Sequence, residues 1–199
     1  CYFAPKAAFC ATQNPAKEFA DMVNAFHEAG LECMMEFYFG KHTALTKMLD
    51  VLRYWKLTYH IDGFHIMGEG ISQELFMKDP LLADCKLFFH DIDGSCVFHG
   101  KVPKFKNAAE YNEGFLYSMR HVLKGDENMT EEFMFRQKRN PLCNGVINYM
   151  ADQDGFTVMD MVSYEERHNE ANGEGNNDGC SYNYSWNCGI EGPSRKQWI

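Results

Sequence analysis

Apolar runs of strand length alternate with segments of helical periodicity along most of the chain. Asn14 is a candidate N-cap and Pro15 suits the first helical position, so a helix is predicted from there to Gly30. Residues 31–39 follow as a buried strand, and residues 44–59 as a second helix. Strands that alternate with helices favour right-handed βαβ units and a parallel sheet, which places the chain in the α/β class.

The alternation continues toward the C-terminus. Further strands are predicted at residues 61–66, 85–92 and 145–151, and further helices at 108–124, 131–138 and 156–162. The strands are apolar on both faces, which is typical of a parallel sheet covered by helices. Asn, Gly and Glu dominate from Glu165, so residues 169–179 are predicted to form a loop. Because no linker is visible, residues 1–199 are expected to be one domain or part of one.

The composition narrows the classes of partner. Nineteen basic against 28 acidic residues give a net charge of −9 in 199 residues, and the basic residues form no patch. Such a chain repels phosphate backbones, so we expect no nucleic-acid partner. No apolar run approaches the roughly 20 residues that span a bilayer, so we expect no membrane partner.

The eight cysteines are too few for a disulfide scaffold and contain no C-x-x-C pair. We therefore expect no structural zinc site. No other metal and no cofactor are expected either. This cysteine usage suits a reducing compartment. The sequence opens with Cys1 and shows no signal peptide, so a cytoplasmic location is expected.

Polar residues gather where the predicted strands end, which is where parallel α/β folds place their chemistry. A single carboxylate or imidazole there is usually a cap or a satisfied core group, but a set at several strand ends indicates a site. The candidates, in chain order, are Glu36, His42, Asp62, His65, Glu69, His90, Asp91, Asp93, Asp152, Gln153 and Asp154.

Around these residues the chain resembles the α-amylase superfamily of glycoside hydrolases, in its glycogen-debranching, isoamylase and pullulanase branch. The matching segments are Tyr2-Phe3-Ala4-Pro5, Glu18 to Val23, Leu52-Arg53-Tyr54-Trp55, Ile61-Asp62-Gly63-Phe64, and a long stretch from Asn148 to Pro193 that includes His168 to Glu174 and Ser185 to Gly189. The resemblance covers nearly the whole chain. It implies a partial (β/α)8 TIM barrel, from roughly the third to the seventh strand, with the remaining strands supplied by flanking sequence.

The family hydrolyses α-glucosidic bonds with retention, using a nucleophilic carboxylate and a carboxylic acid about 5 Å apart. The family's nucleophile motif, D-G-F-R-F-D, corresponds here to Asp62-Gly63-Phe64-His65-Ile66-Met67, so Met67 occupies the nucleophile position and His65 that of the arginine. The motif K-L-I-A-E corresponds to Lys86-Leu87-Phe88-Phe89-His90, so His90 occupies the general-acid position. The resemblance therefore implies that two catalytic carboxylates are replaced.

The third carboxylate, which stabilises the transition state, is retained as Asp154, while its histidine neighbour is Gln153. The motif D-V-V-x-N-H corresponds to Glu36 through His42, one residue longer and without the Asn. By resemblance His65, Gln153, His42, Tyr149 and Trp186 would bind substrate, although packing of the loops is the favoured interpretation for the aromatic residues. Residues 165–193 would form an Asn- and Gly-rich cleft loop, and their spacing does not match a calcium loop.

Two functional hypotheses remain open. In the first, the chain is an α-glucan-binding relative of the debranching enzymes whose hydrolysis is lost or severely reduced. In the second, it is an active α-1,6-glucosidic hydrolase that uses substitute residues, for which Glu69 and Asp91 are candidates. The expected partner in both is an α-glucan such as glycogen or a starch-derived oligosaccharide.

Overall fold

The structure is a computed structural model that describes residues 2–152, 155–184 and 186–196. The chain divides into two compact units. Unit 1 comprises residues 1–111 and 140–146, and unit 2 comprises residues 112–139 and 147–199. The prediction that residues 1–199 form one domain segment stays a prediction.

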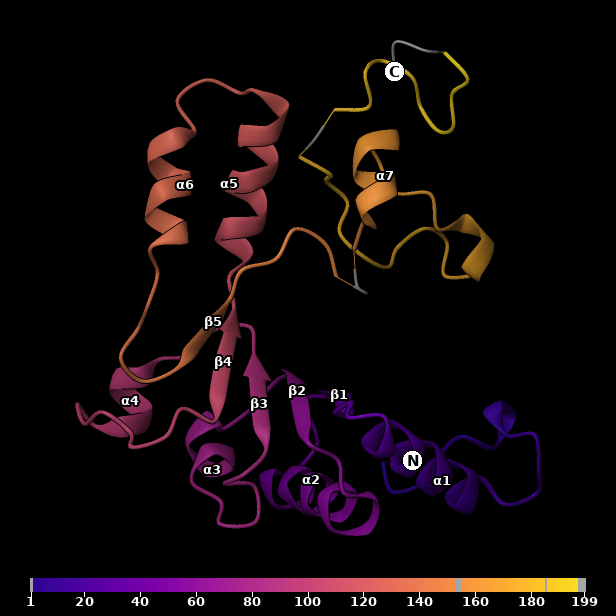
Figure 1. Cartoon of the computed structure of the whole chain (residues 1–199), viewed down its shortest axis with the longest axis vertical. Helices are drawn as coiled ribbons and strands as arrows, with labels where there is room; N and C mark the ends of the chain where they lie inside the picture. Colours follow the sequence, from indigo (N-terminus) through magenta and orange to yellow (C-terminus); the bar gives the residue numbers. More distant parts are fainter. Residues whose placement is uncertain (1, 153–154, 185, 197–199) are drawn as a thin grey trace. The chain divides into compact units, whose positions relative to one another are not determined.

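A five-stranded sheet runs in the order β1 (Met34–Phe39), β2 (Gly63–Gly68), β3 (Lys86–Phe89), β4 (Ala108–Tyr111) and β5 (Gly145–Ile147) (Figure 1). The pairings of β1 with β2, β2 with β3 and β3 with β4 are parallel. Parallel strands joined by helices form an α/β sheet of the kind found in part of a (β/α) barrel, so the predicted fold class is confirmed.

The helices of unit 1 are α1 (Pro15–Glu28), α2 (Leu45–Tyr59), α3 (Gln73–Met77) and α4 (Gly94–Phe98), with a 3₁₀ turn at Ala7–Phe9. The predicted start of α1 is confirmed, because the Asn14 side chain accepts a hydrogen bond of 3.1 Å from the Lys17 N–H. Its predicted end is confirmed as well: Gly30 has φ +75°, a conformation that terminates helices.

The sheet of unit 1 has one apolar, buried face. Phe37, Phe39, Phe64 and Ile66 alternate along β1 and β2 and pack into the core with α2. Trp55 of α2 belongs to this core, where its ring lies 5.2 Å from Phe19 and 4.9 Å from Tyr59 between centroids, and its Nε1–H donates to the Tyr2 carbonyl at 2.7 Å.

The other face of β1 carries exposed side chains, among them Met34 and Tyr38. Among the described residues this face is therefore not covered, which agrees with a strand of a partial barrel, because the second face of a barrel strand points to the barrel interior.

The helices of unit 2 are α5 (Glu113–Lys124), α6 (Thr130–Gln137) and α7 (Val158–Ser163), with a 3₁₀ turn at Glu170–Asn172. Arg120 of α5 is only 3% exposed. Its Nε and Nη2 donate to the Met150 carbonyl at 3.1 and 2.6 Å, and Nη1 donates to the Asn183 carbonyl at 2.9 Å. Asn183 in turn donates to the Met161 and Tyr164 carbonyls at 2.7 and 2.5 Å. These buried bonds connect α5, α7 and the C-terminal loops.

Two predicted elements need correction. The helix predicted at 108–124 begins only at Glu113, because residues 108–111 form β4 and pair with β3, and Asn112 caps the helix by accepting from the Phe115 N–H. Strand pairing outweighs the helix preference of the two alanines. The strand predicted at 145–151 ends at Ile147.

Among the described residues, no helix combines the length and the apolar character that crossing a bilayer requires.

Candidate active site

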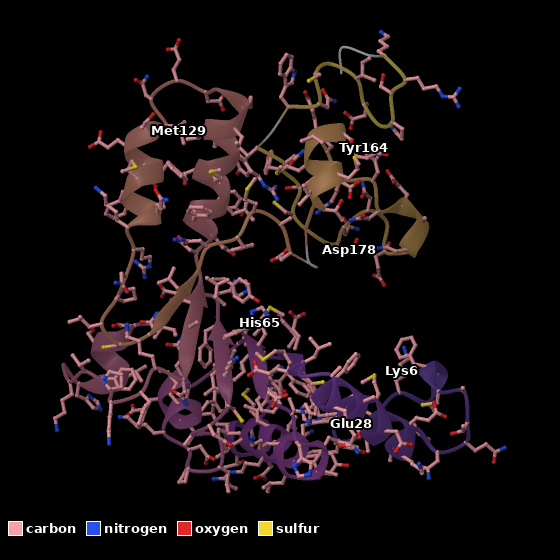
Figure 2. All side chains as sticks on the ribbon, viewed as in Figure 1. Lys6, Glu28, His65, Met129, Tyr164 and Asp178 are labelled. Atoms are coloured by element: carbon pink, nitrogen blue, oxygen red, sulfur yellow. The ribbon has the colours of Figure 1, made fainter. Side chains whose placement is uncertain are left out.

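Strands β1 and β2 bring a carboxylate and an imidazole together. Glu36 and His65 occupy paired positions in the register, and Nδ1 of His65 lies 2.8 Å from Oε2 of Glu36. Because side chains two residues apart share a face, Met67 follows His65 on the same side of β2. The position assigned to the nucleophile thus lies on the face that carries this pair (Figure 2 labels His65).

Aromatic rings surround the imidazole of His65. The Tyr111 ring at the end of β4 lies 4.7 Å from it between centroids, and the ring of His90, which follows β3 directly, lies 5.7 Å away. The structure therefore unites three predicted strand-end residues, Glu36, His65 and His90, and adds Tyr111.

One nitrogen of the His65 imidazole has no hydrogen bond within the described part of the chain. His65 is 9% exposed, and its Nε2 is the buried side-chain atom that lacks a hydrogen-bond partner among the described residues. A buried unpaired ring nitrogen costs about 1–3 kcal/mol, so a ligand hydroxyl that paired with it would be favoured. The Glu36 carboxylate fixes the ring orientation while Nε2 stays available.

The cluster differs from a retaining glycosidase site in its acids. If Met67 and His90 occupy the positions that the motifs assign to them, they offer a thioether and an imidazole, whereas such a site uses two carboxyl groups. The suggested substitutes, Glu69 and Asp91, are both exposed. Glu69 follows β2 directly, and Asp91 lies two residues after the end of β3. Glu36 is the carboxylate that the structure places against His65.

Asp62 was expected among the strand-end residues of the site, and that expectation is wrong. It precedes β2, so it lies at the opposite end of the strand from Met67. Its Oδ2 accepts from the Cys33 N–H at 2.7 Å and lies 2.8 Å from Nε2 of His27. Partial burial alone would raise the pKa of the Asp62 carboxyl, but these bonds and the charges of His27 and Lys56 lower it.

The remaining predicted site residues come from other segments of the sequence. Asp154 and Gln153 fall outside the described residues. His42 is exposed in the turn after β1, whereas Tyr149 is half-buried and Trp186 is 55% exposed, both in unit 2. The catalytic and substrate-binding roles assigned to all of them stay predictions.

Unit 2 has a polar cavity of its own, with a volume of about 290 Å³. Its walls come from α7 and from the predicted cleft loop at 165–193, and its lining includes Phe156, Tyr164, Arg167, His168 and Asp178. The loop is held by internal hydrogen bonds, such as Arg167 Nη1 to the Gly179 carbonyl at 2.6 Å and Asn172 Nδ2 to Asp178 Oδ2 at 2.6 Å. Tyr184 packs against Tyr117 with centroids 4.8 Å apart, so this loop aromatic serves packing.

Glu191 closes the base of the cleft loop. Its carboxylate lies 3.0 Å from Nε2 of His168 and accepts from Asn187 Nδ2 at 2.6 Å and from the Glu165 N–H. The hydrogen bond with His168 is the main cause that lowers the pKa of Glu191 from its ordinary value of 4.5. The ionised carboxylate therefore clasps the two ends of the loop.

We expect Glu191→Gln to lower the thermal midpoint at pH 7, and we expect this difference to shrink as the pH falls below 4.5, the ordinary pKa of a glutamate. Because the folded pKa is below the unfolded one, the clasp contributes fully above the unfolded pKa and is lost as pH falls through the folded pKa. Melts of both proteins followed by near-ultraviolet circular dichroism across this range provide the measurement. A difference that did not shrink at all as the pH was lowered would contradict the assignment.

Sequence reasoning missed Tyr111 and Glu191. Tyr111 fell in a predicted helix, and recognising Asn112 as an N-cap would have placed it at a strand end. Glu191 gave no local signal, since its partner His168 lies 23 residues away.

The sequence is similar to those of known isoamylases and glycogen debranching enzymes. No family model matches the chain. Isoamylase 3, chloroplastic, of Oryza sativa subsp. japonica is 37% identical over 73% of this chain and 22% of its own length. Isoamylase 1, chloroplastic, of Arabidopsis thaliana is 30% identical over 73% of this chain and 24% of its own length.

A glycogen debranching enzyme of Erwinia tasmaniensis is 29% identical over 96% of this chain and 39% of its own length. The chain thus spans well under half the length of the curated relatives that it matches. Similarity over most of the chain, together with the parallel α/β sheet, confirms the resemblance read from the motifs: the chain is a relative of the isoamylase and glycogen-debranching enzymes of the α-amylase superfamily.

Proposed function

We propose that this chain serves as an α-glucan-binding domain of the debranching type whose own hydrolysis is lost or severely reduced. The observation that carries the proposal is the pair of residues at the catalytic positions, Met67 for the nucleophile and His90 for the general acid. The glucan substrate is suggested by the relatives named isoamylase and glycogen debranching enzyme. The partner would be glycogen or a starch-derived oligosaccharide, in a cytoplasmic setting, and flanking sequence would complete the barrel.

The chemistry of the two side chains supports loss of hydrolysis. A thioether cannot form a glycosyl ester and carries no charge to stabilise an oxocarbenium ion. Removing a nucleophile costs about 10⁶-fold in rate in a well-studied protease. An imidazole can donate a proton, but the Met67 position would still provide no nucleophile.

The polar surfaces of both units support sugar binding. In unit 1 the buried Nε2 of His65 offers a hydrogen-bonding group beside the Tyr111 ring. In unit 2 the cavity combines aromatic rings with charged and amide groups, and Tyr182 and Trp186 are 66% and 55% exposed. Sugars are bound by this mixture of flat apolar rings and convergent polar groups.

We expect no release of reducing sugar from glycogen or pullulan by the wild-type protein above a protein-free blank. The matched variant Met67→Asp/His90→Glu restores both acids and is expected to release sugar. Hydrolysis by the wild-type protein would instead support the alternative, an active α-1,6-glucosidic hydrolase with substitute residues. A double variant as inactive as the wild type would contradict the assignment of the defect to these two positions.

Glucan binding is expected to be visible as slower migration in a native gel that contains glycogen. Trp186→Ala should weaken this retardation about fivefold, because a stacking contact contributes about 1 kcal/mol. Phe105→Ala is the control, since Phe105 is 75% exposed and belongs to unit 1 outside the proposed site. Equal migration of the wild-type protein with and without glycogen would overturn the binding proposal.

A further inference from the structure

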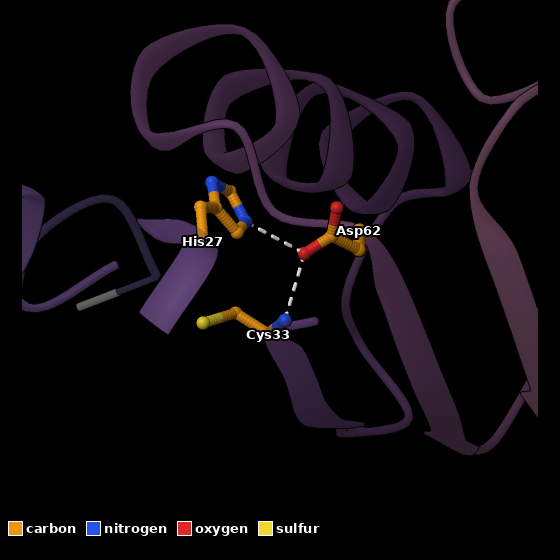
Figure 3. A group of neighbouring side chains, drawn as sticks. All are labelled: His27, Cys33 and Asp62. Carbon is orange, nitrogen blue, oxygen red and sulfur yellow. Dashed lines mark hydrogen bonds and ion pairs between the residues drawn. The ribbon is translucent and has the colours of Figure 1, made fainter. Parts of the chain in front are cut away.

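Three side chains of different chemistry meet where the first two strands begin. His27 belongs to the last turn of α1, Cys33 precedes β1 by one residue, and Asp62 precedes β2 by one residue. One ligand atom from each, an imidazole nitrogen, the Cys33 sulfur and a carboxylate oxygen, lies within 4.8 Å of the other two. Figure 3 shows the three side chains, with Asp62 joined to His27 and to the backbone nitrogen of Cys33.

The backbone around these residues is fixed. The Asp62 N–H donates to the Cys33 carbonyl at 3.0 Å, and the Lys86 N–H donates to the Asp62 carbonyl at 2.9 Å. The Gly30 N–H donates to the His27 carbonyl at 2.9 Å, where α1 ends. Three segments are thus held in place before any ligand binds, which lowers the cost of assembling a site.

The donor set indicates which ion would fit. Zn²⁺ binds thiolate, imidazole and carboxylate groups in a tetrahedron, with bonds that put neighbouring ligand atoms about 3.5 Å apart. Starting from separations within 4.8 Å, small rotations of the side chains reach that spacing. Hard cations such as Ca²⁺ and Mg²⁺ prefer oxygen ligands alone and would not use Cys33 or His27.

Both a positive and a further negative side chain lie near the three residues. The Asp62 carboxylate faces the Lys56 ammonium, but Lys56 also pairs with Asp84, its Nζ lying 3.1 Å from the Asp84 carboxylate. Partial burial and the charge of Asp62 raise the pKa of the Cys33 thiol, so binding of a metal would displace the thiol proton.

We propose that His27, Cys33 and Asp62 form a Zn²⁺ site with three protein ligands. The site lies where β1 and β2 begin, whereas Met67 and His90 lie at or after the ends of their strands. Such an ion would join the end of α1 to the starts of β1 and β2, and a water molecule would complete its tetrahedron. Cysteine spacing gave no hint of it, because each ligand comes from a separate segment. The site does not depend on glucan binding or hydrolysis.

Co²⁺ titration of the full chain tests the proposal, because cobalt bound to a thiolate absorbs in the near ultraviolet. The wild-type protein should give this band with one metal per chain, and Zn²⁺ should abolish it. Cys33→Ser should remove the band, and His27→Gln should weaken binding about tenfold or more. Cys143→Ser and His99→Gln are matched controls from unit 1 and should bind like the wild type.

A second measurement covers the case in which Cys33→Ser fails to fold. Alkylation of the wild-type thiols, mapped by mass spectrometry, should slow at Cys33 when Zn²⁺ is added and stay unchanged at Cys143 and Cys188. Equal alkylation of Cys33 with and without Zn²⁺ would overturn the proposal. So would a cobalt band that persists in folded Cys33→Ser or is absent from the wild-type protein.

Discussion

Arg120→Leu is expected to lower the free energy of unfolding of unit 2 by about 3–5 kcal/mol, because it removes a buried charge that three hydrogen bonds hold in place. Leucine fills part of the space but donates nothing. The carbonyls of Met150 and Asn183 would lose these donors in a region that water does not reach easily. Urea denaturation followed by circular dichroism gives the measurement.

Arg136→Gln provides the matched control for this experiment. Arg136 forms an ion pair with Glu132 at 2.6 Å on the surface of α6, and both side chains are substantially exposed. Exposed pairs contribute about 0.2–1 kcal/mol, so this variant should resemble the wild type. If Arg120→Leu were no less stable than Arg136→Gln, the buried network would not have the structural importance assigned to it.

Gly68→Ala is expected to destabilise unit 1 by about 3 kcal/mol or more, or to prevent soluble expression. Gly68 ends β2 with φ +125°, which side chains rarely adopt. A Cβ there would lie 2.7 Å from the backbone nitrogen of Phe39 and still closer to its carbonyl oxygen. Because backbone cannot move aside as a flexible side chain can, β1 and β2 would be forced apart next to Met67.

Gly70→Ala separates crowding from backbone strain. Gly70 also has positive φ, +71°, but nothing lies within 4 Å of a Cβ built on it. It should therefore cost only about 1 kcal/mol, from conformational preference. Thermal melts of the two variants give the comparison, and equal midpoints would show that the contact with Phe39 is not the cause.

The sequence predicted the elements whose signals are local. Asn14, Pro15 and Gly30 define α1 through short-range capping, so both ends of that helix were predictable. Residues 108–111 were misassigned because their strand conformation comes from pairing with β3, which has no local signature. The position of Asp62 was misjudged for a similar reason. The strand β2 begins at Gly63, two residues after the predicted start at residue 61, so Asp62 lies just before it.

For the candidate site, the sequence supplied the residues but not their partners. Glu36, His65 and His90 were all identified as strand-end candidates, yet the hydrogen bond of His65 with Glu36 depends on the register between two strands. Tyr111 and the unpaired Nε2 atom of His65 emerge only from packing. The replacement of acids at Met67 and His90, by contrast, is a reading of the motifs alone.

The order of strands in the sheet matches their order along the chain, from β1 to β5. Each strand can therefore dock beside its predecessor as soon as it leaves the ribosome, without waiting for a distant segment. Pairing of successive strands closes shorter loops than pairing of distant strands would, which limits the entropy cost of each step. A nascent chain of this kind can accumulate structure from its N-terminus onward, which limits the time during which bare strand edges meet other polypeptides.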